Sequence, residues 1–146
     1  EKRFDRARKI WCKMKNDNIS NLFVVMGEAH SFTKYFVDSN SIDTVYINFP
    51  DPWPKKKHIK HRLIHKEFVD ELSRVMPHKA SVVIATDDLD ATNRMKEFFV
   101  DHKGFMSTLP PPYYTNKWEG YGSSFFDDLW RQKGRSIQYL QFESCC

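Results

Sequence analysis

Glycine is scarce in this sequence: five occur, at positions 27, 104, 120, 122 and 134. None of them forms the glycine-rich turn between a first strand and a first helix with which nucleotide-binding α/β domains commonly begin. Cysteine is scarce too, because Cys12, Cys145 and Cys146 are an odd number without the spacing of metal ligands. The sequence therefore supports neither a disulfide framework nor a zinc site.

Long apolar runs are also missing. No stretch approaches the roughly 18 to 20 consecutive apolar residues that a membrane span needs, and the opening residues EKRFDRARK contain no apolar core of a signal peptide. With 40% hydrophobic and 15% aromatic residues, the 146-residue chain can still bury one core. We therefore expect one globular domain over residues 1–146, in a cytoplasmic protein.

Acidic residues are absent between Asp51 and Glu67. The same interval holds six cationic residues, Lys55, Lys56, Lys57, Lys60, Arg62 and Lys66, although the formal net charge of the whole chain is only +4. A run of like charges is most often a solvated face, but this one directly follows a carboxylate set in the proline-rich turn NFPDPW at residues 48–53. That layout favours a site that positions a nucleic-acid base beside a reactive group.

The order of the expected elements indicates an α/β fold. Segments with helical spacing are residues 2–15, 32–37, 63–76 and 88–100. Short apolar runs typical of strands are residues 21–26, 42–49, 81–86 and 136–142. Alternation of the two, with runs of valine and isoleucine, predicts a Rossmann-like, mostly parallel sheet with helices on both faces. Trp11 and Cys12, in the first helix, are interpreted as packing residues.

Carboxylates follow two of the expected strands. Asp51 comes just after the run at 42–49, and Asp87 and Asp88 follow the run at 81–86. Because open α/β sheets bind ligands at the carboxyl ends of their strands, we expect these side chains at one edge of the sheet. The two later aspartates could also be no more than a helix cap, a role that suits Asp88 better than Asp87.

Four motifs, taken together, carry a resemblance. They are NFPDPWPKKKHIKHR at 48–62, ATDD at 85–88, KGRSIQYLQFE at 133–143 and the initial Glu1. The chain resembles the bacterial tRNA (guanine-N7)-methyltransferase family over essentially its whole length. The resemblance implies a Rossmann-like class I methyltransferase that uses S-adenosylmethionine and modifies tRNA without an obligate protein partner. It also implies that a first strand and its glycine-rich cofactor loop precede residue 1, so we expect a truncated domain.

The same resemblance implies roles for individual residues. Glu1, Glu28 and Asp51 would bind the cofactor, and Asp51 would also be catalytic. Lys55 and Asp87 would contact the substrate. The tract that faces RNA would comprise Lys57, His58, Ile59, Lys60, His61 and Arg62.

The family's late T-x-[FY]-E element aligns with a variant in this chain. Counted back from Lys133-Gly134, it corresponds to Ser124, Phe125, Phe126 and Asp127, which the resemblance assigns to substrate binding. Taken alone, the aromatic residues here, with Trp130, could instead be core residues of a helical turn.

The chemistry of guanine N7 agrees with the carboxylate motif. N7 carries a lone pair and no proton, so its attack on a sulfonium methyl group needs alignment and exclusion of water rather than a general base. We therefore assign Asp51 to positioning the base and to stabilising the positive charge that develops on it. The basic tract would supply salt-dependent affinity for folded RNA.

Other function classes stay open at this stage. A non-catalytic RNA-binding module would use the basic tract but not the carboxylates Glu28, Asp51 and Asp87. An N-methyltransferase acting on a protein or a small molecule would not need so many consecutive cations. The histidines at 58, 61 and 65 have a spacing that metal ligands can adopt, but the surrounding cations disfavour a metal.

Overall fold

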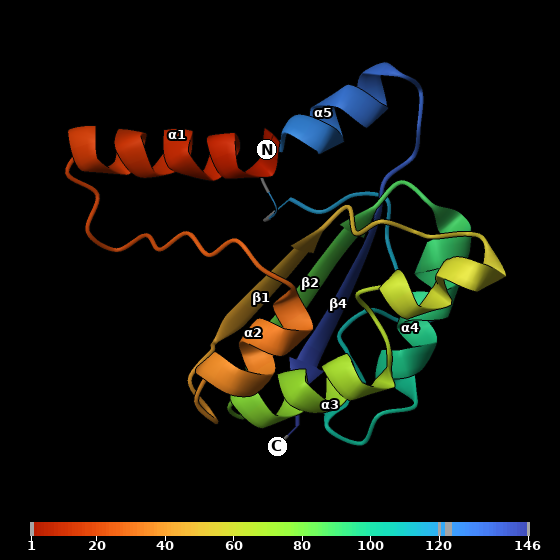
Figure 1. Ribbon diagram of the computed structural model, residues 1–146. Helices are drawn as coiled ribbons and strands as arrows, with labels where there is room; N and C mark the ends of the chain where they lie inside the picture. Colours follow the sequence, from red (N-terminus) through yellow and green to blue (C-terminus); the bar gives the residue numbers. More distant parts are fainter. Residues whose placement is uncertain (1, 120, 122–123, 146) are drawn as a thin grey trace.

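Helices alternate with short strands along the chain, as Figure 1 shows for this computed structural model, which describes residues 2–119, 121 and 124–145. The elements are α1 (Lys2–Asn16), α2 (Ala29–Phe36), β1 (Thr44–Asn48), the 3-10 helix η1 (Lys56–His61), α3 (Lys66–Val75), β2 (Ser81–Thr86), α4 (Leu89–Val100), β3 (Phe105–Ser107), α5 (Phe125–Gln132) and β4 (Gln138–Ser144). Within the described residues, none of the helices combines the length and the apolar composition that a membrane crossing requires.

The four strands form one sheet in the order β1-β2-β4-β3. β1 and β2 are parallel, with Asn48 opposite Ala85, whereas β4 is antiparallel to both β2 and β3. The predicted α/β class is confirmed, and the described sheet is mixed where a mostly parallel one was expected. Helix α5 lies at the carboxyl ends of β1 and β2, so the strand that follows it has to run back in the opposite direction (Figure 1).

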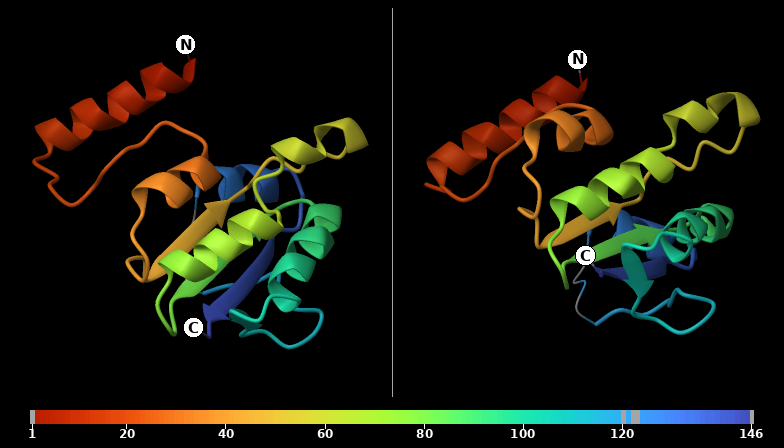
Figure 2. Two further views of the ribbon diagram at one scale, coloured as in Figure 1. Left: turned by 60° about the horizontal axis from the view of Figure 1, so that its bottom comes forward. Right: turned by 90° about the horizontal axis from the view of Figure 1, so that it is seen from below.

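Helices α3 and α4 pack on one face of the sheet (Figure 2). Because side chains alternate along a strand, Val82 and Ile84 of β2 both face these helices. Their partners on the neighbouring strand β4, Phe142 and Leu140, face the same side. The side chains of α3 and α4 that are buried against these strand residues are Phe68, Val69, Leu72, Val75, Ala91, Met95 and Phe99. This face forms the main hydrophobic core.

The opposite face is packed by aromatic side chains near the strand ends. Ala85 and Tyr139 lie there with Ile137, under Phe49, Trp118, Tyr121 and Trp130. These aromatic residues come from the loop after β1, from the long connection before α5, and from α5 itself. The second cluster therefore attaches α5 to the sheet edge where Asp51 and Asp87 are expected.

Two expectations about the first 26 residues are wrong. Residues 21–26 form no strand, and Phe23 in this segment is 85% exposed. The described sheet, in the order β1-β2-β4-β3, does not include this segment. Trp11 is 55% exposed and Cys12 is also exposed, so neither is a packing residue in the described structure.

We expect the substitution Leu140→Ala to reduce the free energy of unfolding by about 2–5 kcal/mol. Leu140 is fully buried at the centre of the main core, and truncation would leave a cavity between β4 and α4. Leu89→Ala is the matched control, because Leu89 is 48% exposed at the start of α4 and its loss should cost about 0.5 kcal/mol or less. Urea denaturation of both variants measures the difference, and equal losses would contradict this description of the core.

Candidate functional site

The carboxyl ends of β1 and β2 bring the predicted acidic residues to one edge. Pairing continues one residue beyond β1, since the Phe49 amide donates to the carbonyl of Ala85 at 2.7 Å. Asp51 and Asp87 therefore leave the sheet at neighbouring positions. Asp88 caps α4, where its carboxylate accepts a hydrogen bond from the Ala91 amide at 2.7 Å. The capping alternative is thus confirmed for Asp88.

The loop that carries Asp51 is held in place by an arginine. Nε and Nη2 of Arg62 donate to the carbonyl of Trp53 at 3.2 and 3.0 Å. Phe49 and Trp53 have φ values of 51° and 39°, a region that residues with side chains adopt rarely. The guanidinium of Arg62 thus maintains an uncommon loop conformation, while the carboxylate of Asp51 stays exposed.

The basic tract forms η1 and the residues around it. Lys55, Lys57 and His61 are exposed, and no acidic partner contacts either lysine in the described part of the chain. The rings of His58 and His61 pack on Trp53, with centroids 5.2 and 5.4 Å from its ring. No group of His, Cys, Asp and Glu suited to a metal ion occurs among the residues the structure describes. The exposed cations are therefore available to an anionic ligand.

Two mainly apolar cavities adjoin the Asp51 loop. One, of about 250 Å³, is lined by Asp51, Ile59 and Arg62 together with residues of α4. The other, of about 340 Å³, lies between α2, β1 and α3 and is lined in part by Ala29 and Asn48. Pro50 lines both, so the loop separates the two cavities.

Glu28 lies at the amino end of α2. Its carboxylate accepts hydrogen bonds from the amides of His30 and Ser31 at 2.8 and 2.7 Å, and so caps the helix. Hydrogen bonding from Ser31, reinforced by the amide of His30, holds the pKa of Glu28 below its usual value. The next residue, Ala29, lines the cavity beside β1. Glu1, the other predicted cofactor ligand, lies outside the described residues, as does the side chain of Lys60.

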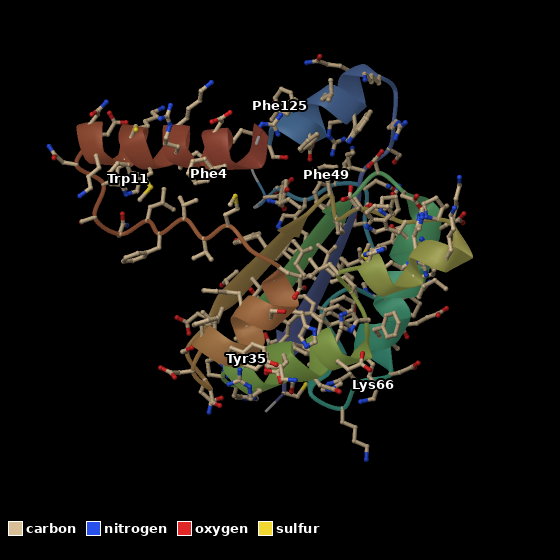
Figure 3. The ribbon with its side chains drawn as sticks, in the orientation of Figure 1. Phe4, Trp11, Tyr35, Phe49, Lys66 and Phe125 are labelled. Carbon is tan, nitrogen blue, oxygen red and sulfur yellow. The ribbon has the colours of Figure 1, made fainter. Side chains whose placement is uncertain are left out.

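The late motif forms the first turn of α5, where its members have different surroundings. Ser124 caps the helix by accepting from the Asp127 amide at 3.2 Å. Phe125 is 75% exposed. Phe126 is exposed as well, and its ring centroid lies 5.8 Å from that of Phe49. Figure 3 labels Phe125 on α5 and Phe49 near the carboxyl end of β1. The alternative that these two phenylalanines are core residues is therefore wrong.

Asp127, by contrast, is only 3% exposed. Its carboxylate accepts hydrogen bonds from Nε of Arg131 and from the hydroxyl of Tyr139, and Nη2 of Arg131 also donates to that hydroxyl, at 2.9 Å. Burial, and then the hydrogen bond to Asp127, raises the pKa of Tyr139. In this arrangement Asp127 attaches α5 to β4 and does not face solvent.

Two further contacts at this edge are not evident from the sequence. Arg135 forms an ion pair with Asp87, the predicted substrate contact, and lies over the ring of Trp130 at 4.2 Å. The hydroxyl of Tyr121 donates to Oδ1 of Asn48 at 2.6 Å. The partners are 48 and 73 residues apart in the chain, so no local spacing could indicate them.

The sequence of this chain is similar to those of known methyltransferases. Residues 1–140 match a family described as "Putative methyltransferase". The tRNA (guanine-N(7)-)-methyltransferase of Chlamydia abortus is 42% identical over 142 residues. The match covers 97% of this chain and 62% of that relative, so the chain spans less than two thirds of its length.

Solved structures show the same fold. An rRNA methylase from Streptococcus thermophilus superposes with a TM-score of 0.55 over 92% of this chain and 64% of its own, at 10% identity. A SAM-dependent O-methyltransferase from Thermotoga maritima gives a TM-score of 0.52 over 100% of this chain and 48% of its own, at 9% identity. The mixed α/β sheet is thus that of Rossmann-like methyltransferases.

Replacing Asp127 by alanine should lower the free energy of unfolding by about 1–3 kcal/mol, because Tyr139 and Arg131 lose a buried acceptor. Asp128→Ala is the control: Asp128 is exposed in the same helical turn, so the two variants share any effect on the helix dipole. Thermal unfolding followed by circular dichroism compares them. Similar losses for both would show that the buried network adds no stability.

Glu28→Ala should destabilise the protein by about 0.5–1 kcal/mol at pH 7, a modest value because the capping carboxylate is exposed to solvent. Since the pKa of Glu28 is lower in the folded state, the cap contributes stability above the unfolded value of about 4.3, and this is lost as the pH falls through the folded-state pKa. The difference from wild type, measured by urea denaturation at pH 7 and pH 3.5, should therefore shrink on acidification. A difference that is independent of pH would contradict the ionised cap.

Proposed function

The chain belongs to a methyltransferase family, and on this basis we propose that the whole protein transfers a methyl group from S-adenosylmethionine to N7 of a guanine in tRNA. The observation that carries the proposal is the Asp51 loop, which holds an exposed carboxylate beside the exposed Lys55 and Lys57 at the carboxyl ends of two parallel strands. Relatives with 42% identity that bear the name tRNA (guanine-N(7)-)-methyltransferase support the substrate.

Asp51 acts on the base without taking a proton from N7. A guanine offers N–H donors on its Watson–Crick edge, and the exposed carboxylate of Asp51 can accept them and so orient the base. The methylated base becomes cationic, and the negative charge of Asp51 stabilises it as the charge develops. Because Arg62 holds the loop at the Trp53 carbonyl, little reorganisation is needed during the reaction.

The lining of the cavity between α2 and β1 supports the proposal that part of the cofactor binds there. Its walls include Ala29, Phe32 and Pro50, which suit an aromatic base, and Asn48 adds a polar group. Ala29 and Pro50 line this cavity. Glu28 directly precedes Ala29 and Asp51 directly follows Pro50, so each predicted carboxylate is next in the chain to a lining residue. When bound, the cofactor supplies a methyl group on a sulfonium sulfur. Glu1 remains a proposed cofactor ligand.

RNA would approach over η1 and the first turn of α5. Lys55, Lys57 and His61 are exposed and can contact phosphates. The exposed rings of Phe125 and Phe126 offer surfaces on which bases can stack. Three of the residues assigned to substrate or RNA contact already have partners within the protein. Asp127 is buried, Asp87 is paired with Arg135, and Arg62 binds the carbonyl of Trp53. We propose that these three position the residues that contact the substrate.

Replacing Asp51 by asparagine in the whole protein should reduce the rate of tRNA methylation by at least about 100-fold, since the negative charge beside the base is lost. Affinity for tRNA should stay nearly unchanged, because the cations supply it. Methyl transfer from labelled S-adenosylmethionine to bulk tRNA, followed by nucleoside analysis for 7-methylguanosine, is the measurement.

Asp43→Asn is the matched control, because Asp43 is exposed just before β1 and so lies at the opposite end of the same strand from Asp51. It should methylate tRNA at the wild-type rate. Equal rates for Asp51→Asn and wild type would overturn the role of Asp51, and a product other than 7-methylguanosine would overturn the proposed function.

A further inference from the structure

Helix α1 carries a strong excess of positive charge that the proposed site does not use. Its sequence KRFDRARKIWCKMKN contains seven lysines and arginines and one acidic residue, Asp5. No ion pair involves its described cationic side chains, which are Arg6, Arg8, Lys9, Lys13 and Lys15. All five are exposed. A charge excess of this size without local compensation suggests an external anionic partner.

The charges are arranged along one side of the helix. Arg6, Lys9 and Lys13 are spaced i, i+3 and i+7, so they form a stripe that extends about 10 Å along the axis. Like charges at these spacings repel, and each pair costs an isolated helix about 0.2–0.5 kcal/mol. The stripe therefore weakens α1 unless a polyanion neutralises it.

The apolar side of α1 faces inward. Phe4, Ala7 and Trp11 line a hollow together with Val24 and Met26, and Figure 3 shows Phe4 and Trp11 on the side of α1 that faces the 21–26 segment. A helix that binds a membrane surface needs its apolar side free to enter the lipid. Here the 21–26 segment lies against part of that side, and Phe4 and Trp11 remain 60% and 55% exposed. The opposite side carries the cationic stripe, which suits a polyphosphate.

The position of α1 suits the same RNA that would reach η1. In Figure 1 and in both views of Figure 2, α1 and η1 flank the carboxyl ends of β1 and β2 from opposite sides. A folded RNA lying over the strand ends could contact both helices at once. Two cationic surfaces on either side of one site would fix the orientation of the RNA as well as its affinity.

We propose that α1 is a second phosphate-binding surface for the RNA substrate, formed by the Arg6, Lys9 and Lys13 stripe. The proposal rests on the proposed function for its choice of partner. It assigns to α1 backbone contacts that are independent of base sequence, whereas Asp51 acts on the target base.

The test compares three double variants of the whole protein. K9Q/K13Q removes two charges from the stripe while keeping good helix formers. K79Q/K103Q removes two exposed charges just before β2 and β3, near the opposite end of the sheet, and is the matched control. K9R/K13R keeps the charge. Binding of bulk tRNA is measured without the cofactor over a series of salt concentrations, with circular dichroism to confirm folding.

We expect K9Q/K13Q to flatten the plot of log affinity against log salt by about 1–2 in slope, and to weaken binding several-fold at low salt. The control and K9R/K13R should match wild type. Equal slopes for K9Q/K13Q and wild type, or no binding of tRNA by wild type, would overturn the inference. So would binding to vesicles of anionic phospholipid that K9Q/K13Q abolishes while its tRNA binding is unchanged.

Methyl transfer is measured separately on the same proteins, so the two proposals can fail independently. Absence of methylation by wild type would overturn the proposed function, while the salt slopes would still decide the role of α1. Normal methylation with unchanged slopes would overturn only the inference about α1.

Discussion

The parallel pairing of β1 with β2 is the constraint on which the candidate site depends. Asn48 lies opposite Ala85, and the bond from Phe49 to Ala85 extends this register beyond the strand. Parallel strands need a crossover, which α3 provides while it covers one face with buried apolar side chains. The result is that two loops with different chemistry, one carrying Asp51 and the other Asp87, leave the sheet side by side.

Polar contacts then set the geometry of this edge. Arg62 binds the carbonyl of Trp53 and so maintains a loop with two non-glycine residues at positive φ. Such conformations cost free energy and persist when surrounding contacts impose them. The exposed carboxylate of Asp51 is thereby placed at the cavity beside α4, and the preceding residue, Pro50, lines both cavities.

Helix α5 is connected to the same edge by charged groups as well as by the aromatic second cluster. Asp127 joins Arg131 to Tyr139 of β4, and Arg135 joins the chain after α5 to Asp87 after β2. The aromatic residues of the second core cluster pack beneath these contacts. Because an unpaired buried carboxylate is costly, this network holds α5 in one position and leaves the rings of Phe125 and Phe126 exposed at the site.

The sequence by itself determined the features that depend on local patterns. The apolar runs became β1, β2 and β4, the helical spacing became α3 and α4, and the position of Asp88 before α4 made it the cap. The basic tract after Asp51 was evident because it is contiguous. The family motifs identified the candidate carboxylates for the same reason.

Only the tertiary structure decided what depends on distant partners. The direction of β4, the absence of a strand at residues 21–26 and the burial of Asp127 all follow from which elements lie beside them. The pairs Arg135 with Asp87 and Tyr121 with Asn48 join residues far apart in the chain. Local propensity carries no information about such contacts, because they form only when the sheet brings the strand ends and α5 together.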